Sequence, residues 1–213
     1  MYERKEEEIK KIFMFTGIIQ ATTKIVSVEK KDTCLRVRVT RPAKWSIALG
    51  QSITVDGICS TVVAFGKTYF DVEYMPETLR KTTAGQFMKD RTVNLERSLT
   101  LRDPLDGSIV SGHVDACGTV TVIEHEGESW LITLSYPLTL SKYIAAQGSI
   151  VVNGVSLTVA QMKKKGTFTV ALIPYTLTHT NLGGLRKKDR VNIEIDVLAR
   201  YVVHALESKN KKK

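Results

Sequence analysis

The 213-residue sequence is poor in cysteine and contains no long apolar run. Its three cysteines, Cys34, Cys59 and Cys117, are an odd number without a CxxC spacing or a neighbouring histidine cluster. This argues against a disulfide framework and against a zinc site. No stretch is long enough to cross a bilayer, and the N-terminus lacks the apolar core of a signal peptide. The sequence therefore predicts a soluble protein of the reducing cytoplasm, with no metal and no membrane partner.

The common signatures of hydrolases and nucleotide-binding enzymes are also missing, since no GxSxG, HExxH or P-loop string occurs. The formal net charge of +9 would favour nucleic acid as a partner, but Lys209 and Lys211 to Lys213 supply four of these charges at one end. A basic nucleic-acid-binding module is thus an interpretation that depends on charge and fold analogy alone. We expect no nucleic-acid partner.

What the sequence does contain is one string written twice. Ser52–Val62 (SITVDGICSTV) returns as Ser149–Val159 (SIVVNGVSLTV). Two further pairs keep the same spacing of 97 to 98 residues, namely Met75–Leu79 with Ile173–Leu177 and Val93–Glu96 with Val191–Glu194. A register held over so many positions indicates an internal duplication and predicts two units of about 100 residues each.

Each unit shows the patterns of short strands. Apolar and polar residues alternate, with many β-branched side chains, at Lys24–Val28, Leu35–Thr40, Thr119–Ile123 and Trp130–Leu134. The repeated string predicts another strand, in which Gly57 or Gly154 marks a bulge, a sharp bend or a close backbone contact. Short strands without a long helix before residue 196 predict a small antiparallel barrel in each unit.

Proline-led segments and the two chain ends complete the prediction. Arg41–Ile47 and Tyr136–Tyr143 each predict a helix of one or two turns. We divide the chain into an N-terminal extension (1–13), two barrels (14–108 and 109–195), a C-terminal helix (196–208) and a basic tail (209–213). Asp196 can cap that helix, whose apolar stripe packs either on its own barrel or on the same helix of other subunits: Leu198, Tyr201, Val202, Ala205 and Leu206.

The duplicated strand carries candidate ligand-binding side chains. Ser156 and Thr158 lie two residues apart, so they share one face of a strand beside the flexible glycine. They are either ordinary solvent-facing residues or a pair that grips the polar edge of a flat heterocycle. The matching first-half pair is Cys59 and Thr61, which places a thiol where the copy has a hydroxyl.

The heads of the two units differ in the same way. Ile18 is matched by His113, and Phe15 is matched by Val110. A lone histidine or cysteine is more often structural than catalytic. Here, however, reactive residue types stand at matching places in one half only, a pattern that suits two similar pockets holding two similar molecules in unlike roles.

Jointly these strings resemble the riboflavin synthase family. The resemblance is carried by Met14–Ile19 (MFTGII), Ser111–Asp115 (SGHVD), the two SIxVxG strings, Met75–Thr78 and Val191–Asp196, and it runs from Met14 to about Leu206. It implies an all-β fold of two tandem, pseudo-twofold-related six-stranded Greek-key β-barrels plus a C-terminal α-helix. It also implies a homotrimer assembled through these helices, with each site between the first barrel of one subunit and the second barrel of a neighbour.

The activity implied by the resemblance is a four-carbon transfer, the last step of riboflavin biosynthesis. Two molecules of 6,7-dimethyl-8-ribityllumazine dismutate to riboflavin and 5-amino-6-(D-ribitylamino)uracil, without a metal or an organic cofactor. An association with lumazine synthase is left open. Histidine titrates near neutrality and suits proton shuttling, while much of the rate should come from holding two rings face to face.

The resemblance also implies the site residues. The catalytic candidates are Cys59, His113, Phe15, Ser52 and Thr158. The pocket of the first barrel is expected to use Gly17, Ile18, Ile19, Cys59, Ser60, Thr61, Glu73, Tyr74, Met75, Pro76, Glu77 and Thr78. The pocket of the second barrel is expected to use Gly112, His113, Val114, Gln147, Asn153, Ser156, Leu157, Thr158, Ala171, Leu172, Ile173, Pro174, Tyr175 and Thr176.

The sequence departs from the family pattern at a few positions. Asn153 stands where the family commonly has Asp, while Asp56 occupies the matching first-half position where Asn is common. Gln147 replaces a frequent Lys, Ser108 replaces a frequent His, and Ser60 puts a hydroxyl on an expected core face in place of Leu. The competing interpretation is an antenna-type relative that binds a lumazine or flavin without chemistry. The presence of both Cys59 and His113 favours the enzyme.

Overall fold

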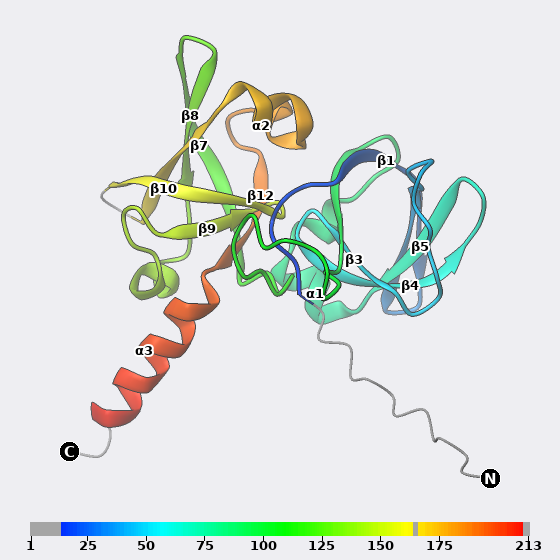
Figure 1. Cartoon of the computed structure of the whole chain (residues 1–213), viewed down its shortest axis with the longest axis horizontal. Helices are drawn as coiled ribbons and strands as arrows, with labels where there is room; N and C mark the ends of the chain where they lie inside the picture. The colour runs from blue at the N-terminus through cyan, green and yellow to red at the C-terminus, as the bar shows by residue number, and fades with distance from the viewer. Residues whose placement is uncertain (1–13, 164–165, 211–213) are drawn as a thin grey trace.

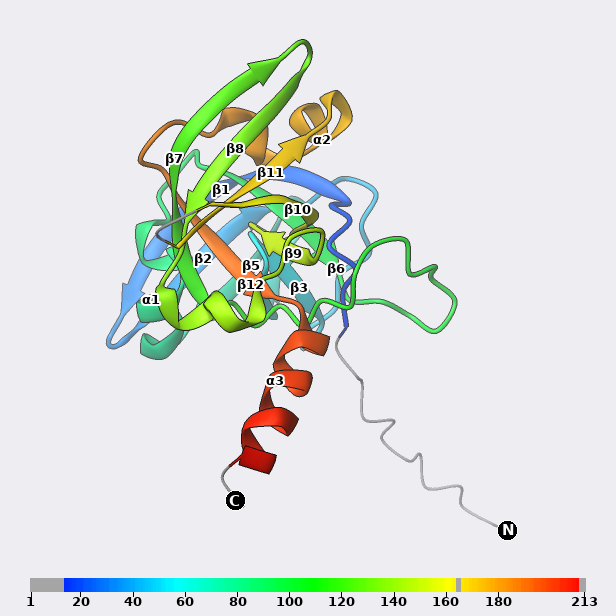
Figure 2. The ribbon, with the colours of Figure 1, turned by 90° about the vertical axis from the view of Figure 1, so that its left-hand side faces the viewer.

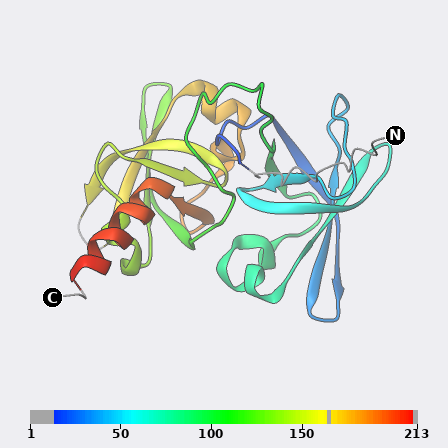
Figure 3. The same cartoon turned by 60° about the horizontal axis from the view of Figure 1, so that its bottom comes forward.

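The computed structural model describes residues 14–163 and 166–210. It contains two closed barrels of six strands each, which lie side by side, and a helix that extends away from the second barrel (Figure 1). Figure 3 shows the barrels side by side in a second view. The predicted fold class is therefore confirmed. The predicted extension over residues 1–13 and the last three lysines lie outside the described residues.

The strands of the two barrels follow one another in the same circular order. The first barrel is closed in the order β1-β2-β5-β4-β3-β6, and the second has the equivalent order β7-β8-β11-β10-β9-β12. The bounds are β1 Ala21–Lys31, β2 Cys34–Thr40, β3 Ser52–Val55, β4 Ile58–Phe65, β5 Tyr69–Tyr74, β6 Thr92–Arg97, β7 Ala116–Glu126, β8 Ser129–Ser135, β9 Ser149–Val152, β10 Val155–Lys163, β11 Thr167–Leu172 and β12 Arg190–Ile195. Each barrel encloses its own apolar core, because alternate side chains of every strand point inward.

Short helices cover matching ends of the barrels. After β5 come α1 (Pro76–Lys81) and the 3-10 helix η1 (Thr83–Gln86), and after β11 come α2 (Pro174–His179) and η3 (Asn181–Gly184). A proline begins each α-helix, where its missing N–H is not needed. The helix predicted at Tyr136–Tyr143 is present as the 3-10 helix η2 (Leu138–Tyr143).

The helix predicted at Arg41–Ile47 is wrong, because this segment forms a turn without a helix. The guanidinium of Arg41 donates to the carbonyl oxygens of Trp45 (2.8 Å) and Gly66 (3.0 Å). The first bond stays within the segment, and the second ties the segment to the β4–β5 loop. The Trp45 side chain is buried in the core of the first barrel. The side chains of Arg41 and Trp45 thus hold this segment in place, where a helix would be held by backbone hydrogen bonds.

The repeated string forms a hairpin of two strands in each barrel, so the predicted strand is interrupted at its glycine. At each turn two successive residues have positive φ: Asp56 (49°) and Gly57 (77°) in the first barrel, Asn153 (46°) and Gly154 (82°) in the second. This conformation is typical of the type I′ turn, for which Asp-Gly and Asn-Gly are preferred. The sharp bend that glycine predicted is therefore present.

The two hairpin turns meet between the barrels. A Cβ added to Gly57 would lie 2.6 Å from the backbone nitrogen of Gly154, and one added to Gly154 would lie 2.8 Å from that of Gly57. Neither position tolerates a side chain. Asp56 and Asn153 flank this contact, so the exchange of Asp and Asn between the halves keeps both residues at the same interface.

A buried polar network joins the barrels at this contact. Asn94 Nδ2 donates to the carbonyl oxygen of Asn153 (2.9 Å), and Asn192 Nδ2 donates to that of Asp56 (2.8 Å). Asn181 Nδ2 also donates to Asp56 Oδ1 (2.8 Å). The repeated Val-Asn string thus supplies, in both copies, an asparagine that crosses to the other barrel.

The C-terminal helix α3 (Val197–Asn210) begins as predicted, since Asp196 Oδ1 accepts a hydrogen bond from the N–H of Leu198 (2.8 Å). It extends past residue 208 and includes Lys209. Arg200 pairs with Asp115 (2.8 Å), and Lys142 pairs with Glu207. The part of the chain that the structure describes does not cover the apolar stripe, and Leu198, Tyr201, Val202 and Leu206 are between 57% and 68% exposed. Among the described residues, no helix is long and apolar enough to span a membrane.

Candidate functional site

Two segments of the chain cross from one barrel to the other, and we call them the first strap (residues 14–20) and the second strap (residues 108–115). They run antiparallel to each other where Phe15 and Val110 exchange backbone hydrogen bonds of 2.8 and 3.0 Å. The second strap follows the long connection after β6, which projects from the molecule (Figure 2). The course of the two straps therefore determines which side chains lie at each barrel.

The first strap is anchored to the first barrel but completes the second. The carboxylate of Glu96 in β6 accepts hydrogen bonds from Thr16 N (2.6 Å), Thr16 Oγ1 (2.7 Å) and Gly17 N (3.0 Å). Gly17 O then accepts from the N–H of Ser156 in β10 (2.8 Å). A Cβ on Gly17 would lie 2.6 Å from Cβ of Ser156, so only glycine allows this approach.

The second strap makes the reciprocal arrangement. Glu194 in β12 accepts from Ser111 N (2.7 Å), Ser111 Oγ (2.6 Å) and Gly112 N (3.0 Å). Gly112 O accepts from the N–H of Cys59 in β4 (2.8 Å). Burial raises the pKa of both anchoring carboxyl groups, Glu96 and Glu194, and the strap hydrogen bonds oppose that rise.

The crossing corrects the expected composition of the two pockets. Gly17, Ile18 and Ile19 lie at the second barrel, whereas Gly112, His113 and Val114 lie at the first. Ile19 packs against the core of the second barrel and Val114 against the core of the first. The duplication shows which residues of the two halves correspond to each other. It does not predict which barrel each strap contacts.

The crossing also brings Cys59 and His113 together. Both line a cavity of about 140 Å³ at the first barrel, with Ile58, Glu77, Thr78, Lys81, Thr82, Gly112 and Val114. His113 is exposed at this cavity, while Cys59 is half-buried. Phe15 is fully buried between the straps and packs against Cys59, so it supports the site from behind.

The environment of Cys59 favours the neutral thiol. Burial raises the pKa of Cys59, the hydrogen bond with the Ser52 side chain lowers it, and the charge of Glu194 raises it further. The thiol is therefore protonated at neutral pH and acts as a weak hydrogen-bond donor rather than as a thiolate nucleophile. Beside it, Arg80 and Lys81 lower the pKa of Glu77 through hydrogen bonds of its carboxylate.

The equivalent region of the second barrel has different chemistry. Ser156 replaces the thiol, and its Oγ lies 2.7 Å from Oγ of Ser108. Ile18, 47% exposed, stands where His113 stands in the other pocket. On α2, Tyr175 and His179 stack with ring centroids 4.0 Å apart, at the positions that Glu77 and Lys81 occupy on α1.

Several predicted residues are buried in the scaffold. Ser60 Oγ lies 3.0 Å from the Tyr74 hydroxyl and donates to the carbonyl oxygen of Ile58 (2.8 Å), which explains how a hydroxyl is accommodated on a core face. Leu172 is in the core of the second barrel. Asn153 belongs to the interface between the barrels. These side chains shape the pockets from behind.

The remaining predicted residues lie on or near the surface. Glu73 pairs with Arg36 (2.8 Å), and Gln147 occupies an exposed turn with φ of 63°. Leu157 is half-buried and packs against the core of the second barrel. Exposed or half-buried positions are also found at Thr61, Met75, Pro76, Thr158, Ala171, Ile173, Pro174 and Thr176.

The predicted site omits several residues, among them Ile58, which also lines the cavity. Lys81 and Thr82 line the cavity with Cys59, and Glu96 and Glu194 hold the straps. The repeated Val-Asn-x-Glu string was the available signal for the glutamates, because it recurs in both halves without an explanation at the level of strands. Within the described residues, no group of three or more His, Cys, Asp or Glu side chains is placed to hold a metal ion.

Comparison with known proteins places this geometry among relatives. The lumazine binding domain model matches residues 16–98 and 111–196. The chain is 37% identical to a riboflavin synthase of Bacillus subtilis (strain 168), covering 94% of this chain and 93% of the relative. It is 40% identical to a riboflavin synthase of Brucella abortus (strain 2308), covering 88% and 96%.

Among solved structures, the fold is similar to that of LumP complexed with 6,7-dimethyl-8-(1'-D-ribityl) lumazine. The TM-score is 0.76 at 25% sequence identity, and the match covers 85% of this chain and 98% of the other. The two barrels are therefore arranged as in a protein that holds a lumazine.

Proposed function

Because the chain belongs to the riboflavin synthase family, we propose that it joins two molecules of 6,7-dimethyl-8-ribityllumazine in a dismutation. One molecule gives a four-carbon unit to the other, which yields riboflavin and 5-amino-6-(D-ribitylamino)uracil. The atoms of the two substrates equal those of the two products, so the reaction requires no external oxidant or reductant. One observation carries the proposal. The strands that contain Cys59 and Ser156 form equivalent regions in the two barrels, each completed by a strap, and the two regions differ in their polar side chains.

The pocket of the first barrel supplies the groups for proton transfer. His113 is accessible, and a histidine can remove or return a proton of a ring methyl group near neutral pH. The neutral thiol of Cys59, hydrogen-bonded to Ser52, is suited to donate a hydrogen bond to a ring atom or to a bound water. Thr78 and Glu77 offer polar contacts at the rim of the same cavity.

The region at Ser156 is suited to the second lumazine. Ser156, Ser108 and Thr158 carry hydroxyl groups, while Ile18 provides an apolar surface in place of an imidazole. Two like molecules would then meet different side chains, as a reaction with one donor and one acceptor requires. Holding both rings in contact converts a bimolecular step into an intramolecular one, which can remove several kcal/mol from the barrier.

We further propose that the active unit is a homotrimer assembled through α3. The proposal is supported by the exposed apolar stripe of α3, which consists of Leu198, Tyr201, Val202 and Leu206. The ion pair between Arg200 and Asp115 joins the helix to the second strap. Burial of the stripe on neighbouring subunits would place the first barrel of one chain next to the second barrel of another.

The test is turnover of the lumazine by the full-length chain. Riboflavin should form with one molecule for every two lumazines consumed, and His113→Gln should lower kcat by about 10²-fold or more with little change in lumazine binding. His125→Gln, an exposed histidine on the β7–β8 hairpin, is the matched control and should be unaffected. Equal turnover by His113→Gln would remove His113 from the mechanism.

The second candidate function is a non-catalytic lumazine-binding antenna protein, which the likeness to LumP favours. The same assay separates the two functions. One lumazine held tightly per chain, without riboflavin formation, would establish the antenna function and exclude the enzyme.

A further inference from the structure

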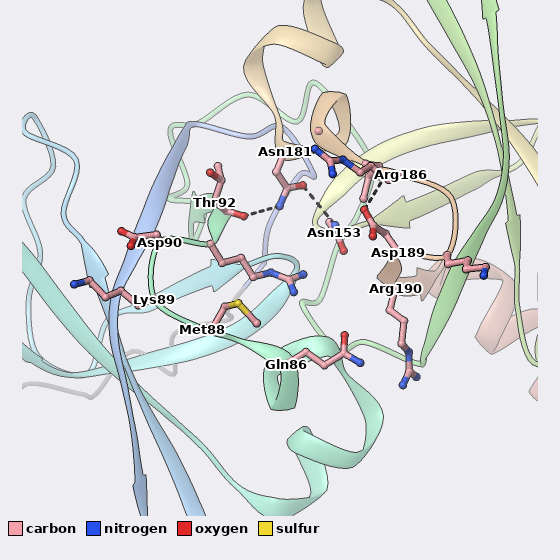
Figure 4. Close-up of a pocket in the computed structure, with 14 residues that line it drawn as sticks. Gln86, Met88, Lys89, Asp90, Thr92, Asn153, Asn181, Arg186, Asp189 and Arg190 are labelled. Carbon is pink, nitrogen blue, oxygen red and sulfur yellow. Dashed lines mark hydrogen bonds between the residues drawn. The ribbon is translucent and has the colours of Figure 1, made fainter.

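A wide cleft lies between the barrels, apart from the cavity that holds Cys59 and His113. Its volume is about 930 Å³. The loop that joins η1 to β6 lines one side and the loop that joins η3 to β12 lines the other, so both barrels contribute (Figure 4). None of the predicted substrate residues except Asn153 borders this space.

The charged side chains of the lining are mainly basic. Two aspartates, Asp90 and Asp189, also border the cleft, and Asp189 Oδ2 accepts a hydrogen bond from the N–H of Arg186 (2.8 Å). The cations outnumber them and come from both barrels: Lys89, Arg91, Arg186, Lys188 and Arg190. A cleft with an excess of one charge between low-dielectric walls concentrates ions of the opposite sign.

Most of these cations have no carboxylate partner among the described residues, although Arg190 interacts with the thiol of Cys117. Arg91 is engaged, because its Nη2 lies 3.8 Å from Oδ2 of the buried Asp56. Within residues 14–163 and 166–210, the charged atoms of Lys89, Arg186, Lys188 and Arg190 lie farther than 4.0 Å from any carboxylate oxygen. Lys89, Arg186, Lys188 and Arg190 thus border the cleft without a partner carboxylate among the described residues, and this excess of cations leaves the region electropositive. Their side chains extend in different directions, with Lys89 and Arg190 pointing away from each other (Figure 4).

The floor and walls add groups that suit a small organic ligand. Asn181 and Asn153 lie at the floor, where internal hydrogen bonds hold both amides. Asn181 donates to Asp56 and Thr92 (Figure 4), and the oxygen of the buried Asn153 side chain accepts from the N–H of Asn192 (2.8 Å). Gln86 adds a third amide, and Met88 and Leu185 add apolar surface. The volume lies within the range of small-molecule sites.

From this combination we propose that the cleft binds a phosphate-bearing small molecule of nucleotide size. The guanidinium groups of Arg186 and Arg190 can chelate phosphate oxygens in pairs, while Lys89 and Lys188 contribute point charges. Gln86 and the apolar side chains of Met88 and Leu185 would contact the rest of the ligand. Because the two loops belong to different barrels, the bound anion would bridge them. The proposal does not depend on the lumazine reaction.

Calorimetric titration of the full-length chain with ADP, inorganic pyrophosphate and adenosine tests the proposal. We expect ADP and pyrophosphate to bind and adenosine not to bind, with affinity falling as salt is raised from ~50 to ~300 mM. Tighter binding of ADP than of pyrophosphate would show that the cleft also contacts the nucleoside, whereas equal binding would limit recognition to the phosphates. Absence of binding by both anions at millimolar concentration would overturn the proposal.

Paired variants separate the cleft from general surface charge. Arg186→Gln with Lys188→Gln should weaken ADP binding by about tenfold or more. Lys44→Gln with Lys67→Gln removes the same charge from exposed positions outside the cleft and should change it less than about twofold. Lys89→Gln with Arg190→Gln provides a second cleft variant if the first unfolds. Equal weakening by the cleft and control pairs would overturn the proposal.

Discussion

Replacing Asp56 by asparagine should make the stability of the protein less sensitive to pH. Asp56 is fully buried between the barrels, and its Oδ2 has no hydrogen-bond partner within the described part of the chain. Burial raises the pKa of this carboxyl from 3.8 to about 6, although bonds from Asn94 and Asn181 and the charge of Arg91 oppose the rise. The ionised form is therefore disfavoured in the folded protein.

The sign and size of the effect follow from linkage. Between pH 4 and 6 the folded protein binds more protons at Asp56 than the unfolded chain does, so stability present below pH 4 is lost as pH rises through about 6. A rise from 3.8 to about 6 corresponds to about 3 kcal/mol, at about 1.4 kcal/mol per pH unit. Asp56→Asn keeps an oxygen that accepts from Asn94 and Asn181 but carries no charge to desolvate.

The assay is urea unfolding of both proteins from pH 4 to 7.5 at one chain concentration, so that any association contributes equally. The stability of Asp56→Asn relative to the wild type should increase by about 2 to 3 kcal/mol across this range. Asp32→Asn is the matched control, because Asp32 has a similar positive φ (47°) in an exposed turn. A difference between Asp56→Asn and wild type that stays constant with pH would refute the reasoning.

Three further predictions concern the site and the assembly. Glu194→Ala should cost about 2 to 4 kcal/mol and lower kcat about tenfold or more, because three donors of the second strap lose their acceptor; unchanged kcat in the folded variant would contradict the anchoring role. Cys59→Ser should retain more turnover than Cys59→Ala, because a neutral donor is needed, whereas equal inactivity of both would indicate a thiolate. Truncation after Asp196 should give a monomer by light scattering that has lost turnover, and an active monomer would disprove a site shared between subunits.

The sequence predicted the parts of the fold that depend on local periodicity. The alternating segments at Lys24–Val28 and Thr119–Ile123 lie within β1 and β7, and the capped helix begins after Asp196. These features follow from inward-facing side chains and from one side-chain hydrogen bond. The register of the duplication was equally visible, since it needs only a comparison of the chain with itself.

The parts that could not be predicted depend on contacts between distant residues. The sequence around Gly17 and Gly112 does not indicate that each glycine lies against the opposite barrel, because the strands that they could contact, β4 and β10, are very similar in sequence. The turn at Arg41 likewise depends on the carbonyl oxygen of Gly66 in another loop. The hydroxyl of Ser60 on a core face likewise depends on a distant partner, the hydroxyl of Tyr74.

The straps also make the two barrels dependent on each other. A barrel separated from its twin would keep its glutamate anchor but would lose the arm that covers its β4 or β10 strand. It could regain that contact only by binding the strap of another molecule, and this association would become slower as the protein is diluted. Joining the copies in one polypeptide makes the arm exchange internal, with a high effective concentration at any level of expression.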